Sequence, residues 1–529
     1  MLWLFFVGAC DRYDPSDIGM ARPPEDPPTP TPDTPSVTPH VLLVLVDDMG
    51  WTGPSTDRTN RGNGSDYYLT PTIDRLAAAG VSFDAAYASP VCQASRALIL
   101  SGQSAGRTKV YSNGDPNLVA PELRLFDLPY YDDYLDTEIV TLAETLENAG
   151  WMTGHFGKWH VGKEGSTGPE EQGFELNRGG TSEGLVTGGS DGHLAEYDGS
   201  WDLPNLEANG VPFQFMADRL TDEVIAFLGT EPERAKYAQL WHFSVHAPVM
   251  ALDEDVEYFS GLTPGERHSD PLYAAMQYNL DYNLDRLLTY LETTEDGRAP
   301  GAMLIDNTLL ILASDNGGSG GYTLEGVDTG REFTNNLPLY HGKSTTWEGG
   351  VRVPVIVRWD RGKQGGRIVS TPITLADIYP TVCGITGIPL PEGTAMDGAD
   401  LEPLLVSDDP EWTRTDSFLH YPVYLDNGEA YGADILRETP TSVAWRGDYK
   451  LIYDWDLGAI EGEHAAWKLF DLATDIGETV NVADANPEIV QSVGTALVEW
   501  LVATDSDPLV DAATGEIVPW PDPSAFTVP

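Results

Sequence analysis

The chain has 529 residues, 41% of them hydrophobic, which is enough for one large domain and a smaller one. Asp and Glu number 83 against 30 Lys and Arg, so the formal net charge is −53. This balance excludes nucleic acid as a partner, because the phosphate backbone would be repelled. It also suggests adaptation to a saline medium, where ions screen the repulsion between carboxylates.

The first ten residues are similar to a bacterial lipoprotein signal, an apolar stretch that is cut before a lipidated cysteine, here Cys10. No Lys or Arg precedes the apolar part, and a frayed apolar tail is the alternative. Residues 11–39 are rich in Pro, Thr and Asp and are expected to form an extended linker. We therefore expect export to the bacterial periplasm or cell surface. Membrane association is expected only through a lipid on Cys10.

From residue 40 to about residue 405, strand-like and helical patterns alternate. One helix is expected from Thr70 as the capping residue, with Pro71 in its first turn and Gly80 as its end. The alternation predicts an α/β fold with a mostly parallel sheet between helices. The strand-like runs are residues 41–46, 152–156, 238–245, 308–313 and 353–357, and the other helical patterns are residues 140–149, 215–228 and 272–291.

After about residue 405 the pattern changes. Residues 442–453 alternate around a turn at Gly447 and Asp448, which predicts a β-hairpin. Residues 467–472 form another strand-like run, and residues 489–502 form a helical pattern. We expect a main domain over residues 40–405 and a smaller C-terminal α+β subdomain with an antiparallel sheet over residues 406–529.

Carboxylates follow two of the predicted strands. Asp47 and Asp48 end the first strand, and Asp315 and Asn316 end the strand at residues 308–313. Ligands of open α/β sheets bind beyond the carboxyl ends of strands, and neighbouring carboxylates repel each other unless a cation lies between them. Either pair alone is more typical of a turn or a helix cap. Together they favour a site for a hard cation such as calcium or magnesium.

Three widely spaced cysteines, Cys10, Cys92 and Cys383, exclude a disulfide framework, and no cysteine and histidine spacing fits zinc. Cys92 opens the segment Cys-Gln-Ala-Ser-Arg-Ala-Leu-Ile-Leu, which places it at the N-terminus of a helix that contains Arg96. Backbone N–H groups favour anions at such a position. The alternative is an unreactive buried cysteine.

Basic and imidazole side chains follow further strands. Lys158 and His160 come after residues 152–156, and two residues at this spacing in a strand share one face. His246 closes the run at residues 238–245, and Lys343 precedes the segment Glu348-Gly-Gly-Val-Arg-Val-Pro. A surface position for Lys158 and His160, and a structural role for His246, are the alternatives.

Over residues 41–405, these segments together resemble the formylglycine-dependent sulfatases, which are arylsulfatase-type members of the alkaline phosphatase superfamily. Cys92 to Arg96 is similar to the maturation motif Cys-x-Pro-Ser-Arg, with Ala94 in place of Pro. Two further departures are Val245, where the family usually has Pro, and Gln103, where it often has Arg. The resemblance implies a large, mostly parallel sheet sandwiched by helices, with residues 40–405 as the catalytic domain.

The resemblance also implies one calcium ion and a formylglycine made from Cys92 by a maturation enzyme. Asp315-Asn316 stands where phosphatases of this fold usually have Asp-His and hold two metals, which favours a single ion. Lys158 and Lys343 would bind sulfate, Arg96 would orient the aldehyde hydrate, and Glu348 and Arg352 would be structural. The implied metal ligands are Asp47, Asp48, Cys92 as formylglycine, Asp315 and Asn316.

In the implied reaction, the hydrated aldehyde is activated by calcium and Asp315 and attacks sulfur, while His246 protonates the leaving alcohol. His160 then deprotonates the remaining hydroxyl, sulfate is expelled and the aldehyde returns. The cationic groups stabilise the charge of the transferred group. The substrate would be a sulfated small molecule or carbohydrate. Two alternatives stay open: a phosphodiester or phosphonate monoester hydrolase of the same superfamily, and a non-catalytic surface-binding protein with unconverted Cys92.

Overall fold

In the computed structural model, the residues described are 37–117, 119–184, 203–206, 214–320, 333–362, 365–426 and 436–527. The expected signal segment, Cys10 and most of the linker lie outside the described residues. None of the helices in these ranges is long and apolar enough to cross a membrane.

The main sheet has nine strands, with β1 (His40–Val46) in its interior. On one side β1 pairs in parallel with β7 (Thr308–Ser314), and on the other with β6 (Lys236–Trp241). β4 (Met152–Gly157) continues the parallel run beside β6. The remaining strands are β2 (Val81–Tyr87), β5 (Leu176–Arg178), β8 (Arg352–Trp359), which is antiparallel to both β7 and β2, β9 (Arg367–Val369) and β10 (Ile373–Thr374). The predicted mostly parallel sheet is confirmed.

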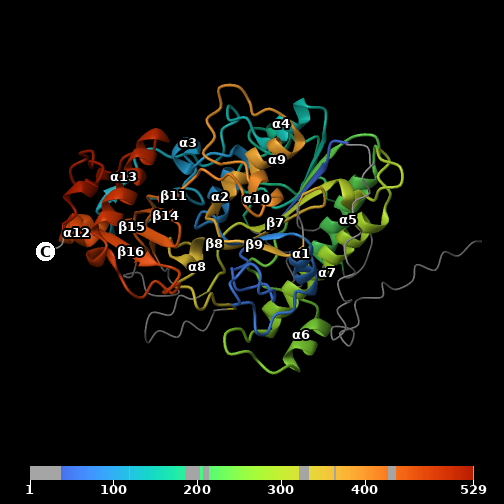
Figure 1. The fold of residues 1–529 in the computed structure, drawn as a ribbon, viewed down its shortest axis with the longest axis horizontal. Helices are drawn as coiled ribbons and strands as arrows, with labels where there is room; N and C mark the ends of the chain where they lie inside the picture. Colours follow the sequence, from blue (N-terminus) through green and yellow to red (C-terminus); the bar gives the residue numbers. More distant parts are fainter. Residues whose placement is uncertain are drawn as a thin grey trace, which may run out of the picture.

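Helices cover both faces of the sheet, which explains why β1 is apolar without interruption. Leu42 and Val44 belong to the core formed with the helices on one face, whereas Val41 and Leu43 belong to the core on the other. The helices of the first core are α1 (Pro71–Ala79), α5 (Met216–Gly229) and α7 (Pro271–Thr293), and those of the second are α2 (Cys92–Ser101), α4 (Leu142–Asn148) and α9 (Ile378–Thr386) (Figure 1).

The start of α1 differs from the prediction in one respect. Thr70 occupies the capping position, but its side chain makes no capping bond and instead accepts a hydrogen bond from the backbone N–H of Ser55 at 2.8 Å. The buried carboxylate of Asp281, from α7, accepts the N–H groups of Thr72 and Ile73, each at 2.9 Å. A residue from another helix therefore satisfies the free donors of α1.

The strand predicted at residues 238–245 is shorter than expected. β6 ends at Trp241, and the following residues form a loop against the end of β1. Asp47 N–H donates to the carbonyl of Ser244 at 3.0 Å, and Val245 N–H donates to the carbonyl of Asp47 at 2.8 Å. The apolar residues after Trp241 are thus buried in a loop that holds Asp47, and the prediction that His246 closes a strand was wrong.

A four-stranded antiparallel sheet forms the C-terminal part (Figure 1). Its strands are, in spatial order, β11 (Asp416–Tyr421), β14 (Thr441–Arg446), β15 (Tyr449–Asp454) and β16 (Trp467–Asp471), and α13 (Pro487–Ala503) packs against it. The predicted hairpin and closing helix are confirmed, whereas the division at residue 405 stays a prediction. Short elements are α3 (Ala105–Thr108), α6 (Asp253–Ser260), α8 (Glu348–Val351), α10 (Glu402–Val406), α11 (Trp455–Glu461), α12 (Glu463–Ala466), β12 (Leu425–Asp426), β13 (Leu436–Glu438), and β3 (Phe126–Asp127), which pairs with β17 (Val510–Asp511).

A buried ion-pair network connects the two sheets, and we call Glu348, Arg352, Lys450 and Glu478 the junction network. Glu348 at the start of α8 lies 2.8 Å from the guanidinium of Arg352 and 3.1 Å from Lys450 Nζ of β15. Lys450 Nζ also lies 2.7 Å from Glu478 Oε1. These contacts fit the structural role expected for Glu348 and Arg352.

Candidate active site

The two carboxylate pairs predicted from the sequence meet at one edge of the main sheet. β1 and β7 are parallel neighbours, so Asp47 and Asp48 emerge beside Asp315 and Asn316. Asp48 N–H donates to Asp315 Oδ1 at 3.2 Å, and Asn316 Nδ2 donates to Asp48 Oδ1 at 2.8 Å. All four side chains are buried.

Cys92 faces these carboxylates from the N-terminus of α2, as the sequence predicted. Its Sγ lies 3.3 Å from Asp47 Oδ1 and 3.9 Å from Asp48 Oδ1. Burial raises the pKa of the thiol well above its usual range, and the charges of Asp315 and Asp47 raise it further. An unmodified Cys92 is therefore protonated at neutral pH and is not a reactive thiolate.

Three buried cations surround the cluster. Arg96, one turn into α2, donates to Asp315 Oδ2 through Nε at 3.1 Å and Nη2 at 2.7 Å, and its guanidinium lies over the ring of Trp241. Lys158 Nζ donates to Asp47 Oδ2 at 2.6 Å. Lys343 Nζ lies 2.6 Å from Asp48 Oδ1 and 3.3 Å from the sulfur at position 92.

The cations keep the buried carboxylates ionised. Burial alone would raise the pKa of Asp47, but the charges of Lys158, His246 and Arg96 together outweigh it, and the pKa lies below its usual value. The same holds for Asp48, where Lys343 makes the largest opposing contribution. The cluster therefore contains charged carboxylates that can bind a cation.

Lys158 and His160 reach this region by a different route from the one predicted. β4 ends at Gly157, so neither residue lies in a strand, and the argument from a shared strand face was wrong. Gly157 has a φ of 100°, and a Cβ at this position would lie 2.1 Å from the carbonyl oxygen of Trp241. A glycine is required here because the chain turns tightly against β6 before Lys158.

The loop that carries Lys343 is held by contacts that sequence reasoning missed. Lys343 N–H donates to the carbonyl of Gly318 at 3.0 Å, and Ser344 N–H donates to the carbonyl of Pro90 at 2.8 Å. Asn336 Nδ2 donates to the carbonyls of Gly318 at 3.0 Å and His341 at 3.1 Å. A single asparagine in a loop carries no sequence signal, so only the structure identifies Asn336 as a positioning residue.

Two histidines lie beside the charged cluster. His246 Nε2 lies 3.7 Å from Asp48 Oδ2, and 18% of its side chain is exposed. Burial lowers the pKa of His246, while the carboxylate of Asp48 opposes that shift. Burial also holds the pKa of His160 well below its usual value, and the charges of Lys158 and Arg96 add to this. His160 is therefore neutral at pH 7, and its Nδ1 is buried without a hydrogen-bond partner.

The oxygen donors of this site fit a hard cation. Ligand atoms of Asp47, Asp48, Cys92 and His246 all lie within 4.8 Å of one another. Asn316 Oδ1 is buried and has no hydrogen-bond partner, which is costly unless another group satisfies it. Carboxylate and carboxamide oxygens are the ligands that calcium and magnesium prefer. Sequence reasoning had assigned His246 to sulfate contact or to proton transfer, and did not place it among the metal ligands.

The charges of the cluster balance before any ion binds. Asp47, Asp48 and Asp315 carry three negative charges, and Arg96, Lys158 and Lys343 carry three positive charges. A divalent cation would make the site positive within a chain of net charge −53. A site of this kind attracts an anionic group and stabilises additional negative charge during a reaction.

Comparison with known proteins identifies the family. The family model described as Sulfatase matches residues 39–388. A curated sulfatase from Formosa agariphila is 28% identical, over 92% of this chain and 93% of its own length, and human arylsulfatase A is 29% identical over 86% of each chain. A crystal structure of Ps i-CgsB in complex with k-i-k-neocarrahexaose has a TM-score of 0.66 at 23% identity, covers 88% of this chain and 93% of that chain, and shares the alkaline phosphatase-like fold. The chain belongs to the sulfatase family, whose members are sulfuric ester hydrolases.

Proposed function

We propose that the protein hydrolyses sulfate esters of carbohydrates, using a formylglycine made from Cys92 and one bound calcium ion. The observation that carries the proposal is the position of the sulfur at residue 92, 3.3 Å from both Asp47 Oδ1 and Lys343 Nζ. Oxidation of this side chain to an aldehyde would supply a nucleophilic hydrate, and a calcium ion on the neighbouring oxygens would supply positive charge.

The residues around position 92 would bind the sulfate group. Lys158 and Lys343 would offer their ammonium groups to the sulfuryl oxygens. Arg96 is held by Asp315 and by the carbonyl of Lys158, so it would act mainly by positioning these two groups. Asp47, Asp48, Asp315 and the free Oδ1 of Asn316 would hold the cation. Substrate binding here needs no large rearrangement, because the charges are already in place.

The two histidines would transfer protons. His246 is partly exposed and lies beside Asp48, so it would protonate the leaving alcohol. His160, with a buried and unpartnered Nδ1, would accept the proton that accompanies release of sulfate. Proton donor and proton acceptor would thus be separate residues.

The carbohydrate part of the proposal is supported by one neighbour in fold. The structure of Ps i-CgsB holds a neocarrahexaose, and that chain matches 88% of this one. An exported enzyme anchored at Cys10 would meet such polymers outside the cell, and a formylglycine-generating maturation enzyme that accepts Ala94 would be its partner during synthesis.

Mass spectrometry and turnover together test the proposal. Peptides that contain residue 92, from protein made with a maturation enzyme, should show loss of the thiol and gain of an aldehyde. We expect Cys92→Ala to lower hydrolysis of 4-nitrophenyl sulfate by on the order of 10⁴-fold or more, because the nucleophile is lost. Cys383→Ala removes the other free cysteine of the described residues and serves as the matched control. Unmodified Cys92 in active protein would contradict the proposal.

Parallel assays separate the competing activities. We expect 4-nitrophenyl sulfate to be hydrolysed with a higher kcat/KM than bis-4-nitrophenyl phosphate. The opposite order would favour a phosphodiester or phosphonate monoester hydrolase. Unconverted Cys92 together with no turnover of either compound, in protein from the native host, would favour a non-catalytic surface-binding protein.

A further inference from the structure

The helix that carries Cys92 begins without a cap of its own. Val91 occupies the capping position of α2 and has no side-chain oxygen, so the free N–H groups of the first turn need another acceptor. Asn113 supplies one, because its Oδ1 accepts a hydrogen bond from Gln93 N–H at 3.1 Å. Asn113 belongs to the segment between α3 and α4, so a residue from outside α2 caps this helix.

Gln93 binds the same segment with its side chain. It follows Cys92 directly and is buried. Its Oε1 accepts a hydrogen bond from Gly114 N–H at 3.0 Å, and its Nε2 donates to the carbonyl of Asp133. A glutamine can accept and donate at once, so one side chain holds both ends of residues 113–133. We call this segment the brace.

The other side of the brace is fastened to the C-terminal part. Its strand β3 pairs with β17, and Tyr424 Oη accepts the N–H groups of Leu125 at 3.1 Å and Phe126 at 3.2 Å. Phe126 is buried in the core of the C-terminal part, and Val91 and Ala94 belong to the same core. The start of α2, the brace and the C-terminal part are therefore packed together.

The position of residue 92 matters for the proposed chemistry. Its sulfur lies 3.3 Å from both Asp47 Oδ1 and Lys343 Nζ, and a misplacement of about 1 Å can lower a rate by about 10²-fold. Lys158 and Lys343, which would bind sulfate, belong to segments other than α2. A shift of α2 would therefore move the nucleophile away from the sulfate group without removing these two lysines.

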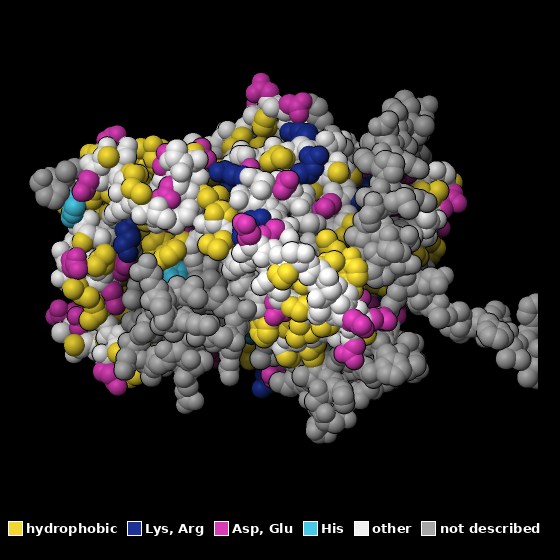
Figure 2. Space-filling model, turned by 90° about the horizontal axis from the view of Figure 1, so that it is seen from below, with side chains coloured by type: hydrophobic (Ala, Val, Ile, Leu, Met, Phe, Trp, Pro, Cys, Tyr) yellow, Lys and Arg dark blue, Asp and Glu magenta, His cyan; other side chains and the backbone are white. Residues whose placement is uncertain are grey.

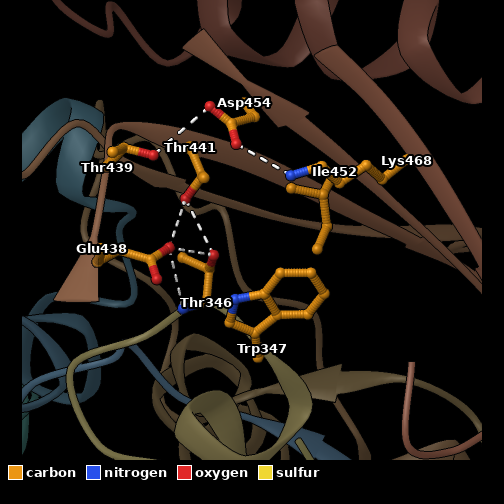
Figure 3. A pocket seen from close by; sticks show the side chains of 8 residues that line it. All are labelled: Thr346, Trp347, Glu438, Thr439, Thr441, Ile452, Asp454 and Lys468. Carbon is orange, nitrogen blue, oxygen red and sulfur yellow. Dashed lines mark hydrogen bonds and ion pairs between the residues drawn. The ribbon is translucent and has the colours of Figure 1, made fainter. Parts of the chain in front are cut away.

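The C-terminal part contacts the active-site region at a second place, beside Lys343. Thr346, three residues further on, donates from Oγ1 to Glu438 Oε1 at 2.7 Å (Figure 3). Lys450 Nζ donates to the carbonyl of Thr346 at 2.8 Å. This attachment holds the loop of a lysine proposed to bind sulfate, whereas the brace holds the start of the nucleophile helix.

We propose that Asn113 and Gln93 are positioning residues for the nucleophile, and that the brace fixes residue 92 relative to the C-terminal part. The inference rests on the proposed hydrolysis of sulfate esters by formylglycine at position 92. It gives the C-terminal part a role in turnover. Loosening the brace slows the chemical step, whereas loosening the attachment at Thr346 weakens sulfate binding.

Variants of Asn113 test the cap, and they leave the sequence around Cys92 unchanged. Asn113→Ala removes the acceptor, and in the full-length, matured protein we expect kcat for 4-nitrophenyl sulfate to fall by roughly tenfold, with KM changed by less than about twofold. Asn113→Asp keeps an acceptor oxygen at the start of the helix and should restore kcat to within about threefold of the parent value. Rates are divided by the formylglycine content, measured by mass spectrometry.

A second variant and a control accompany this test. Gln93→Leu releases both ends of the brace and should lower kcat more than Asn113→Ala does. Asp270→Ala removes the side-chain cap of α7, a helix without a proposed catalytic residue, and is the matched control for the loss of a cap. We expect Asp270→Ala to change kcat by less than about twofold.

The second attachment provides the opposite pattern. Glu438→Ala removes the acceptor of Thr346 and should raise KM for 4-nitrophenyl sulfate and the inhibition constant of inorganic sulfate, each by roughly fivefold. Its kcat should fall less than that of Asn113→Ala. Identical effects of the two variants on kcat and KM would contradict separate roles for the two attachments.

The outcomes separate the inference from the proposed function. If the parent protein is active but Asn113→Ala lowers kcat no more than Asp270→Ala does, the positioning role is wrong and the proposed function stands. The same conclusion follows if Asn113→Asp is as slow as Asn113→Ala. If protein that contains formylglycine hydrolyses no sulfate ester, the proposed function fails, and the positioning role fails with it.

Discussion

Two clusters of buried charge lie close to each other in this chain, and they differ in how far they reach solvent. The cluster around Cys92 contains buried polar atoms without hydrogen-bond partners, such as Asn316 Oδ1 and His160 Nδ1, and it reaches solvent at His246. In the junction network, Glu348 binds both Arg352 and Lys450 and is fully buried. Burial of charge is common to both, so it does not mark function.

The two clusters also differ in the protonation of their carboxylates. Burial would raise the pKa of Asp47 and Asp48, but each has a lysine within 2.6 Å and the pKa stays below its usual value. In the junction network, Lys450 is shared between two carboxylates. Burial raises the pKa of Glu478 to about 7, since Lys450 offsets it only in part and the charge of Glu348 adds to it. A site prepared for a cation keeps its carboxylates charged, whereas a structural network does not need to.

Replacing Lys450 should have the largest effect on stability. Lys450→Met leaves Glu348 and Glu478 facing each other without their shared cation, and breaking a buried pair costs about 3–5 kcal/mol. Urea unfolding measures the loss, with Lys163→Met, an exposed lysine, as the control. Lys450→Met/Glu478→Gln should recover part of the loss, because it removes one of the two carboxylates. A loss below about 1 kcal/mol would show that the network contributes little.

The matched change in the catalytic cluster should act on turnover instead. Lys343→Met removes an ammonium group proposed to bind sulfate, and we expect kcat/KM for 4-nitrophenyl sulfate to fall by about 10²–10³-fold. Its effect on unfolding should be smaller than that of Lys450→Met, because a bound cation would face the same carboxylate, Asp48, once the lysine is removed. Equal destabilisation by the two variants would remove the distinction between the clusters.

The pH dependence of stability tests the protonation of Glu478. The pKa of Glu478 is raised in the folded state, so its contribution is complete below the unfolded value of 4.5 and is lost as pH rises through about 7. We expect this residue to account for a loss on the order of 2–3 kcal/mol between pH 5 and 8. Glu478→Gln should flatten that part of the profile in urea unfolding. An unchanged slope would mean that Glu478 is ionised throughout.

Much of the catalytic cluster was predictable because its residues follow strands whose order could be inferred. Asp47 and Asp315 end neighbouring parallel strands, and Cys92 begins a helix, so local patterns together with the α/β fold place them at one edge. The family resemblance added Lys158 and Lys343, although the strand geometry argued for Lys158 was wrong.

The supporting residues could not be predicted, because they act over long separations in the chain and carry no local pattern. Asp281 caps a helix more than 200 residues earlier, and Asn336 holds the loop of Lys343. Lys450 lies in a β-hairpin strand that the sequence did predict. Alternating polar and apolar residues show on which face of a strand a side chain lies, but not which residue it contacts. The contacts of Glu438 with Thr346 were missed for the same reason.

Removing a proposed metal ligand should have a smaller but specific effect. Asn316→Ala deletes the one unpartnered amide oxygen of the described catalytic cluster, and we expect calcium to bind about 10–100-fold more weakly. Titration calorimetry on chelator-treated protein measures this without turnover. Asn486→Ala, at the start of α13, is the control. Unchanged calcium affinity would exclude Asn316 as a ligand.

Added salt should change the contribution of the surface charges to stability and leave that of the two buried clusters nearly unchanged. Figure 2 shows acidic side chains spread over the described part of one face, and the whole chain carries a net charge of −53. Repulsion between exposed carboxylates is screened within about 3 Å at 1 M salt, so the melting temperature should rise by a few degrees up to that concentration and then level off. The loss caused by Lys450→Met should persist at 1 M NaCl, since buried pairs are screened much less. A melting temperature that stays flat up to molar NaCl would contradict salt adaptation, and loss of the Lys450→Met effect would show that the junction network is open to solvent ions.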